Sequence, residues 1–444
     1  MQGTVWGSLM CTSTMDKLGK TAYENPDILY KYNGVPIPPL GMVDDVESVS
    51  GVENTAKINK LINTFIEHKK LKLSESKCSR IHIGNNHEDC PELKVHESSM
   101  KESDNEKYLG DVISKDGKNQ ATIDNRKAKA IGAIAEIMSI IEEIPFGKHK
   151  FEVAMKLRES MFLNRILCNS EAWHAVTAAN IVALEKLDQE FLRSILKAHS
   201  KTTKEMLYLE TGAIPIRWIL PQRRINYLKH IVSRKKEELI LKVFEAQKEN
   251  KTKGDFVTLV EHDLRMFGLT HEEVAAESMT KKALKKELKQ KAQRLAFADL
   301  MQQLQKGSKG KDTKYNNLEI QEYLISAKLN DEDKHVMTAL RTKCVKGIRR
   351  NFPGIHRVCQ HCPQNCMPQE PQEDTQEHVL SCRSIGAQST VPIEFLGAGT
   401  VEQSLFAKEF SKRMRRREEL LEDRLDSSCS CSGLPGVIPD QRAL

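Results

Sequence analysis

The sequence predicts an α+β fold, and three observations predict it. Short β-prone runs bounded by turn residues alternate with helical patterns up to residue 118, which indicates a small sheet with helices. Apolar residues at helical spacing dominate residues 119–350. Cysteines and a histidine at metal-ligand spacing gather between residues 359 and 382. The chain is therefore expected to combine a small sheet, a mainly helical region and a short zinc-binding segment.

Composition places the chain among ordinary globular proteins, long enough at 444 residues for roughly two to four domains. The formal net charge of +7 comes from 68 Lys and Arg against 61 Asp and Glu, which is compatible with a polyanionic partner. No run of about 18 apolar residues occurs, so no membrane partner is expected. The cysteines before residue 359 are scattered, as intracellular thiols are, which predicts a location in the nucleus or cytoplasm.

The first expected elements are a helix and two hairpins. Residues 8–18 have helical spacing, and residues 28–32 form a β-prone run that ends at the turn signal Asn33-Gly34. An apolar run then leads to the adjacent carboxylates Asp44-Asp45, and a second short β-type run leaves them. This pattern is typical of a hairpin that presents two carboxylates at its turn.

Asp44 and Asp45 are candidate magnesium ligands. Mg²⁺ is a hard cation that binds one or two carboxylates and keeps open positions for substrate phosphates. A solvated turn is the alternative interpretation, because aspartates are common at turns. The neighbouring segments decide between the two.

The next expected elements are an amphipathic helix and two strands. Apolar residues recur at helical spacing over residues 58–66. Lys77 stands just before a strand expected over residues 79–84, and the polar residues 85–107 are expected to form a loop. A second strand is expected over residues 108–114, starting with Tyr-Leu-Gly.

Taken in order, these motifs resemble the palm of reverse transcriptases (RNA-directed DNA polymerases) of the non-long-terminal-repeat retrotransposon type. The resemblance implies that an opening Gln-Gly contacts template and nucleotide, and that the Asp-Asp hairpin binds the catalytic metal. It also implies that a lysine lies near the phosphates and that Tyr-Leu-Gly holds the primer end. The matching residues are Gln2, Gly3, Asp44, Asp45, Lys77, Tyr108, Leu109 and Gly110.

Two departures from the family pattern bear on activity. Family members carry an earlier strand with a further metal-binding aspartate and a fingers region before it, whereas this chain starts after both. We therefore expect residues 1–118 to be a partial palm, with Asp44 as metal ligand, Asp45 peripheral and Lys77 assisting the leaving pyrophosphate. A two-metal site would lack a ligand, so the chain alone is expected to be inactive as a polymerase.

The helical region resembles the thumb of the same family over residues 119–240, followed by a basic linker region over residues 241–350. A thumb holds the template–primer duplex through phosphate contacts, which Lys and Arg make without reading sequence. Residues 281–314 carry eleven Lys or Arg against three Asp or Glu, which predicts a basic amphipathic helix. A helical bundle with solvated basic residues is the alternative. The candidate nucleic-acid contacts are Arg223, Arg224, Lys346, Arg349 and Arg350.

Residues 351–390 contain a candidate zinc site. A Cys-x2-Cys pair followed by His-x3-Cys supplies four ligands of the kinds that Zn²⁺ binds tetrahedrally. The segment resembles the cysteine–histidine motif near the C-terminus of many such retroelement proteins, where it could contact nucleic acid or only order the chain. Residues 391–444 are expected to form a charged helix and a disordered tail. The four ligands are Cys359, Cys362, His378 and Cys382, with Cys366 as a substitute for Cys362.

The sequence therefore favours the C-terminal part of a retrotransposon reverse transcriptase that binds an RNA template and a DNA primer. Its cofactors would be Mg²⁺, if the chain is catalytic, and Zn²⁺. One alternative is a non-catalytic, zinc-containing nucleic-acid-binding protein derived from such a transposable element. Another is a degenerate copy without function.

Overall fold

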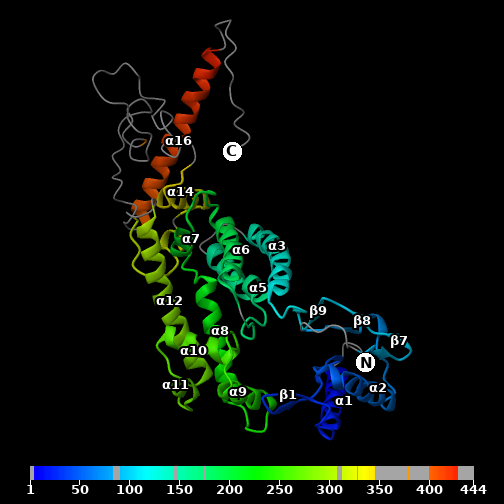
Figure 1. Cartoon of the computed structure of the whole chain (residues 1–444). Coiled ribbons are helices and arrows are strands. Elements are labelled where there is room, and N and C mark those ends of the chain that lie inside the picture. The colour runs from blue at the N-terminus through cyan, green and yellow to red at the C-terminus, as the bar shows by residue number, and fades with distance from the viewer. Residues whose placement is uncertain are drawn as a thin grey trace. The chain divides into compact units, whose positions relative to one another are not determined.

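Helices dominate the structure, a computed structural model (Figure 1). It describes residues 5–83, 91–144, 149–174, 176–307, 313–327, 329–345, 379 and 400–428. The chain is 61% helical and 9% strand, so the expected mixture of helices and small sheets is confirmed. Among the described residues, every helix is too short or too polar to span a lipid bilayer.

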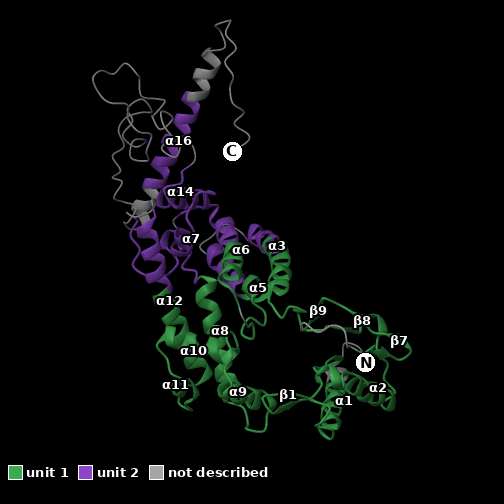
Figure 2. Cartoon of the chain, in the orientation of Figure 1, with its two compact units in different colours: residues 1–134, 160–188, 215–295 green, residues 135–159, 189–214, 296–444 purple. Residues whose placement is uncertain are grey.

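The chain divides into two compact units, each assembled from separate stretches of sequence (Figure 2). Unit 1 consists of residues 1–134, 160–188 and 215–295. Unit 2 consists of residues 135–159, 189–214 and 296–444. Helices α3 (Gln120–Glu143), α6 (Ala178–Leu196) and α12 (Lys281–Lys306) each contribute residues to both units.

Unit 1 starts with two helices that share an apolar core. These are α1 (Val5–Tyr23) and α2 (Val52–His68), and the predicted helical spacing of α2 is confirmed. Phe65 and Ile66 of α2 pack with Met15 and Leu18 of α1 because both helices bury one apolar stripe. Burying each such side chain stabilises the fold by about 1.5–3 kcal/mol.

Five two-stranded ladders accompany these helices, and no larger sheet forms among the described residues. The predicted turn at Asn33 and Gly34 is confirmed, since both residues have positive φ (45° and 86°), as a tight hairpin turn requires. The ladders pair β1 (Tyr30–Tyr32) with β2 (Val35–Ile37), β3 (Leu40–Met42) with β4 (Asp45–Glu47), β5 (Ser79–Arg80) with β8 (Lys101–Glu102), β6 (Lys94–Val95) with β7 (Ser98–Ser99), and β9 (Asn105–Tyr108) with β10 (Asp111–Ser114).

Two strand predictions were wrong. The single strand expected over residues 108–114 is a hairpin, because Leu109 and Gly110 have φ values of 45° and 94° and turn the chain. The expected loop over residues 85–107 contains four short strands in its described part, β6 to β9. The strand expected to begin at Ser79 ends at Arg80.

Helix α8 (Ile216–Val232) packs against α9 (Leu239–Glu249), α10 (Phe256–Phe267) and α11 (His271–Ala275) in unit 1. Pro215 stands at the N-cap of this helix, and Pro221 is accommodated inside it. A π-helical turn occupies Arg158–Phe162. The other helices assigned wholly to unit 1 are α1, α2 and α5 (Leu163–Ile166).

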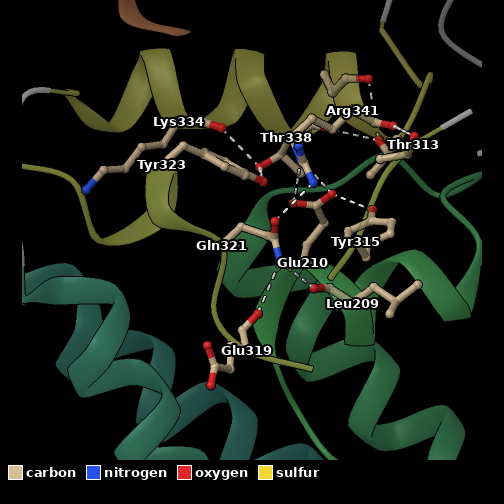
Figure 3. Close-up of polar contacts among 12 residues, drawn as sticks. Leu209, Glu210, Thr313, Tyr315, Glu319, Gln321, Tyr323, Lys334, Thr338 and Arg341 are labelled. Atoms are coloured by element: carbon tan, nitrogen blue, oxygen red, sulfur yellow. Dashed lines mark hydrogen bonds and ion pairs between the residues drawn. The ribbon is translucent and has the colours of Figure 1, made fainter. Parts of the chain in front are cut away.

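Unit 2 is helical and encloses a buried polar network (Figure 3). Glu210 on α7 has no exposed side-chain surface, and Arg341 on α14 is only 6% exposed. The guanidinium Nε of Arg341 donates to Glu210 Oε1 at 2.9 Å, and the Tyr315 hydroxyl donates to the same oxygen at 2.5 Å. The helices that lie wholly in unit 2 are α4 (Lys150–Leu157), α7 (Lys204–Thr211), α13 (Glu322–Ile325), α14 (Asp331–Arg341) and α16 (Thr400–Ser428).

Candidate functional site

The Asp-Asp motif lies at the tip of the β3–β4 hairpin. Met42 pairs with Asp45, so Val43 and Asp44 form the two-residue turn and Asp45 begins the second strand. Asp44 and Asp45 are both exposed. A Cβ on Gly41 would lie 2.8 Å from Met15 Cβ, so glycine permits the close approach of β3 to α1. The helix thus supports the strand that leads to the carboxylates.

Val43 carries local backbone strain beside the aspartates. Its φ is 58°, in the left-handed region that a β-branched residue rarely adopts. Such a conformation costs of order 1–3 kcal/mol and is found most often at functional sites. The hairpin therefore holds Asp44 in a turn whose first residue, Val43, disfavours the required backbone conformation.

Sequence reasoning missed Glu47, two residues after Asp45. Residues i and i+2 of a strand face the same side, so Glu47 and Asp45 share one face of β4. Burial raises the pKa of the Glu47 carboxyl group. The alternation of acidic residues at positions 45 and 47 was the sequence signal that could have identified it.

Tyr108 lies within electrostatic range of this pair of carboxylates. Burial raises the pKa of the Tyr108 hydroxyl, and the negative charges of Glu47 and Asp45 raise it further. The Asp-Asp and Tyr-Leu-Gly motifs, which lie far apart in sequence, are therefore electrostatic neighbours in unit 1. Because carboxylate oxygens are hard ligands, Asp45 and Glu47 have the right chemistry for a Mg²⁺ ion whose remaining ligands come from phosphates and water.

The turn of the β9–β10 hairpin is anchored to the helices of unit 1. Asn169 Nδ2 donates to the carbonyl of Leu109 at 3.0 Å. Arg126, which is only 3% exposed, donates to Asp111 Oδ1 at 2.5 Å and to the carbonyl of Cys168 at 3.2 Å. The positive φ of Gly110 allows this turn, so the glycine of the Tyr-Leu-Gly motif has a backbone role.

Lys77 is exposed at the end of a 3₁₀ turn, Glu75–Lys77. Within the described residues, the structure joins Lys77 to neither Asp44 nor Asp45 by a hydrogen bond or ion pair. The predicted site residues are therefore only partly grouped. Asp45 and Tyr108 are electrostatic neighbours, whereas no described contact joins Lys77 to the two aspartates.

Arg223 and Arg224 use their guanidinium groups inside unit 1. Arg224 is 9% exposed and donates to both carboxylate oxygens of Asp263, at 2.5 and 3.1 Å. Arg223 donates to the carbonyl of Leu167 at 2.6 Å, and burial lowers its pKa while nearby Glu171 opposes that shift. Both residues were predicted to contact nucleic acid, and in the structure their guanidinium groups have partners within unit 1.

A cluster of exposed positive charge in unit 1 lies on the first half of α12. Leu284 and Leu288 are fully buried, which confirms the predicted apolar stripe. The opposite side of the helix carries exposed lysines that form no ion pair within the described part of the chain, namely Lys282, Lys285 and Lys286. We call these three residues the α12 lysine face.

The remaining predicted site residues lie outside the described residues. They are Gln2, Gly3, Lys346, Arg349, Arg350, Cys359, Cys362, Cys366, His378 and Cys382. Within the described ranges, no three side chains of His, Cys, Asp or Glu come close enough together to hold a metal ion.

Comparison with known proteins identifies no match for this chain among protein-family models, curated proteins or solved structures.

Proposed function

We propose that the chain is the C-terminal part of a reverse transcriptase of the non-long-terminal-repeat retrotransposon type, which binds template–primer nucleic acid and does not extend a primer alone. The observation that carries the proposal is the electrostatic proximity of Asp45 and Glu47 to Tyr108 in unit 1. Asp45 and Tyr108 belong to two of the polymerase motifs, and the family resemblance requires both at the primer end.

The hairpin carboxylates would hold Mg²⁺ if the site is completed. Asp44, Asp45 and Glu47 supply only carboxylate oxygens, which suit that ion. The ion would neutralise charge at the nucleotide phosphates. The sequence has a single Asp-Asp hairpin, so binding without primer extension is the expected activity of the chain alone. The Cys359, Cys362, His378 and Cys382 set remains our proposed Zn²⁺ site on its donor chemistry.

The α12 lysine face supports the binding part of the proposal. Lysines without carboxylate partners contribute to phosphate binding by releasing counterions from the nucleic acid. A non-catalytic nucleic-acid-binding protein derived from a retroelement would use the same surface. Neither candidate is expected to extend a primer alone, so the binding test below applies to both.

The test measures binding of the full chain to a fluorescent DNA primer annealed to an RNA template, by anisotropy at several salt concentrations. We expect affinity to fall steeply with salt, and the triple variant K282Q/K285Q/K286Q to lower the slope by about three. The matched control is K248Q/K251Q, which removes lysines already paired with Glu245 and Glu261. Both variants should keep the wild-type melting temperature.

Two results would contradict the proposal. Absence of primer–template binding at low salt would contradict the proposed nucleic-acid-binding function. Primer extension in Mg²⁺ by the wild type, abolished by Asp44→Asn, would show that the chain is an active polymerase.

A further inference from the structure

Three basic side chains meet where α8 ends and α12 begins. The guanidinium Nη2 of Arg234 lies 2.7 Å from Nε2 of His230. The ammonium Nζ of Lys281 lies 3.5 Å from Nδ1 of the same ring. Each ring nitrogen of His230 thus faces a cation.

This arrangement cannot satisfy all three groups. Lys and Arg side chains only donate hydrogen bonds, whereas a neutral imidazole has one acceptor nitrogen and one N–H. If Nε2 accepts from Arg234, then the Nδ1–H of His230 points at the ammonium of Lys281. Two donors face each other there, and an acceptor between them would relieve the conflict.

The His230 ring is held in place, and its surroundings disfavour the protonated form. It stacks on Tyr227 with ring centroids 5.9 Å apart and an interplanar angle of 12°, and Tyr227 packs edge-on against Phe256. Burial lowers the pKa of His230, and the charges of Arg234 and Lys281 lower it further, against an opposing effect of Glu238. The donor conflict therefore belongs to a ring that is held in place by stacking.

The backbone that leads to α12 is also fixed. Lys229, which is 8% exposed, donates to the carbonyls of Ala275 and Ala276, the residues that end α11. This contact holds the α11–α12 connection against α8. Lys281 is consequently presented beside His230 by the fold, and not by the flexibility of its own side chain alone.

The cluster has more positive than negative charge. Glu238 is 3.5 Å from Arg234 and offsets that cation in part. Exposed lysines follow on both chain segments, and within the described residues they form no ion pair: Lys235, Lys236 and Lys282. An anion that entered the cluster would meet this excess of cations at an exposed position.

We propose that His230, Arg234 and Lys281 form a binding site for one phosphate group of a nucleic-acid backbone. One phosphate oxygen accepts from the Lys281 ammonium and from the Nδ1–H of His230, while Arg234 donates to Nε2 and fixes the tautomer. The nature of the ligand rests on the proposed function, and the site continues into the α12 lysine face through Lys282.

The experiment compares the wild-type full chain with Lys281→Gln, Lys281→Arg and Arg234→Gln/Lys281→Gln, using the same primer–template. We expect K281Q and the double variant each to reduce the salt slope by about one, because both lose the same single phosphate contact, while K281R keeps the wild-type slope. K248Q/K251Q is again the control. Lysine acetylation followed by mass spectrometry should show that duplex protects Lys281 and leaves Lys248 reactive.

Each outcome is decisive. Wild-type binding with an unchanged slope in the double variant and an unprotected Lys281 would overturn the site and leave the proposed function standing. No duplex binding by the wild type would overturn both. Protection of Lys281 by phosphatidylserine vesicles but not by duplex would assign the cluster to a membrane surface and so contradict the proposal. Melting temperatures equal to wild type establish that the variants fold.

Discussion

Arg341 binds Glu210 through Nε, which lies 2.9 Å from Oε1 and 3.0 Å from Oε2, inside unit 2. The rings of Tyr315 and Tyr323 lie 5.2 and 5.7 Å from the guanidinium carbon. Burial alone would lower the pKa of Arg341, but the Glu210 carboxylate raises it overall. The Arg341 guanidinium therefore stays charged, and its contact with Glu210 joins α7 to α14.

Glu210→Gln should lower the free energy of unfolding of unit 2 by about 3–5 kcal/mol, because it leaves the buried Arg341 charge without its partner. The measurement is urea denaturation followed by circular dichroism. Glu419→Gln is the control, since Glu419 pairs with Arg416 on an exposed surface of α16 and its loss should cost less than about 1 kcal/mol. Equal effects of the two changes would contradict the assignment.

Stability should fall as pH falls from 6.5 to 4, because of His335. Burial lowers its pKa to about 4, with further lowering by Lys197 and Lys150 and opposition from Asp331 and Glu332. The unfolded chain binds a proton near pH 6.5, so the stabilisation is present above that pH and is lost on acidification.

The expected loss from His335 is on the order of 2 kcal/mol, since partial exposure screens the effect. The measurement is the unfolding free energy at a series of pH values. His335→Gln should flatten this part of the profile, and an identical profile in wild type and variant would exclude His335 as the cause.

Gly212→Ala should destabilise unit 2 by more than about 2 kcal/mol, because a Cβ there would lie 2.5 Å from backbone atoms of Glu319 and Ile320 and φ is 67°. Gly132→Ala is the opposite case: it sits in α3 with no atom within 4 Å of its added Cβ. That change should stabilise the protein by about 0.5–1 kcal/mol. Thermal melting of both variants tests the contrast.

Val43→Asn should stabilise the β3–β4 hairpin by about 1 kcal/mol, because asparagine tolerates positive φ better than a β-branched residue does. Chemical denaturation measures the gain. A loss of stability would indicate that Val43 makes compensating contacts.

Arg224→Met should reduce stability by about 3–5 kcal/mol, because Asp263 would remain buried without its partner. The salt slope of primer–template binding should stay at the wild-type value under conditions where the variant is folded. A reduced salt slope would show that Arg224 contacts nucleic acid, as the sequence analysis predicted.

Sequence patterns predicted the elements that depend on local rules. The apolar stripes of α2 and α12 and the turn at Asn33-Gly34 follow from helical period and positive φ, so they were found. The hairpin at Leu109-Gly110 was missed, because a turn with leucine at its first position lacks the usual turn residues.

The candidate site was predicted only as far as spacing allows. The carboxylate pair and Tyr108 were both identified, but their proximity and the part played by Glu47 depend on tertiary packing. Arg223 and Arg224 were expected to be exposed cations. Their internal partners, among them Asp263, lie on other elements and cannot be read from the local pattern.

The division of unit 2 among separate stretches of chain has a consequence for its synthesis. Arg341 follows Glu210 by 131 residues. Because ribosomes add about 5–20 residues per second, Arg341 is synthesised roughly 10 s after Glu210. During that time the Glu210 side chain, which has no exposed surface in the finished unit, lacks the charge that Arg341 supplies. A nascent chain paused before residue 341 should therefore recruit chaperones, and one released after it should not.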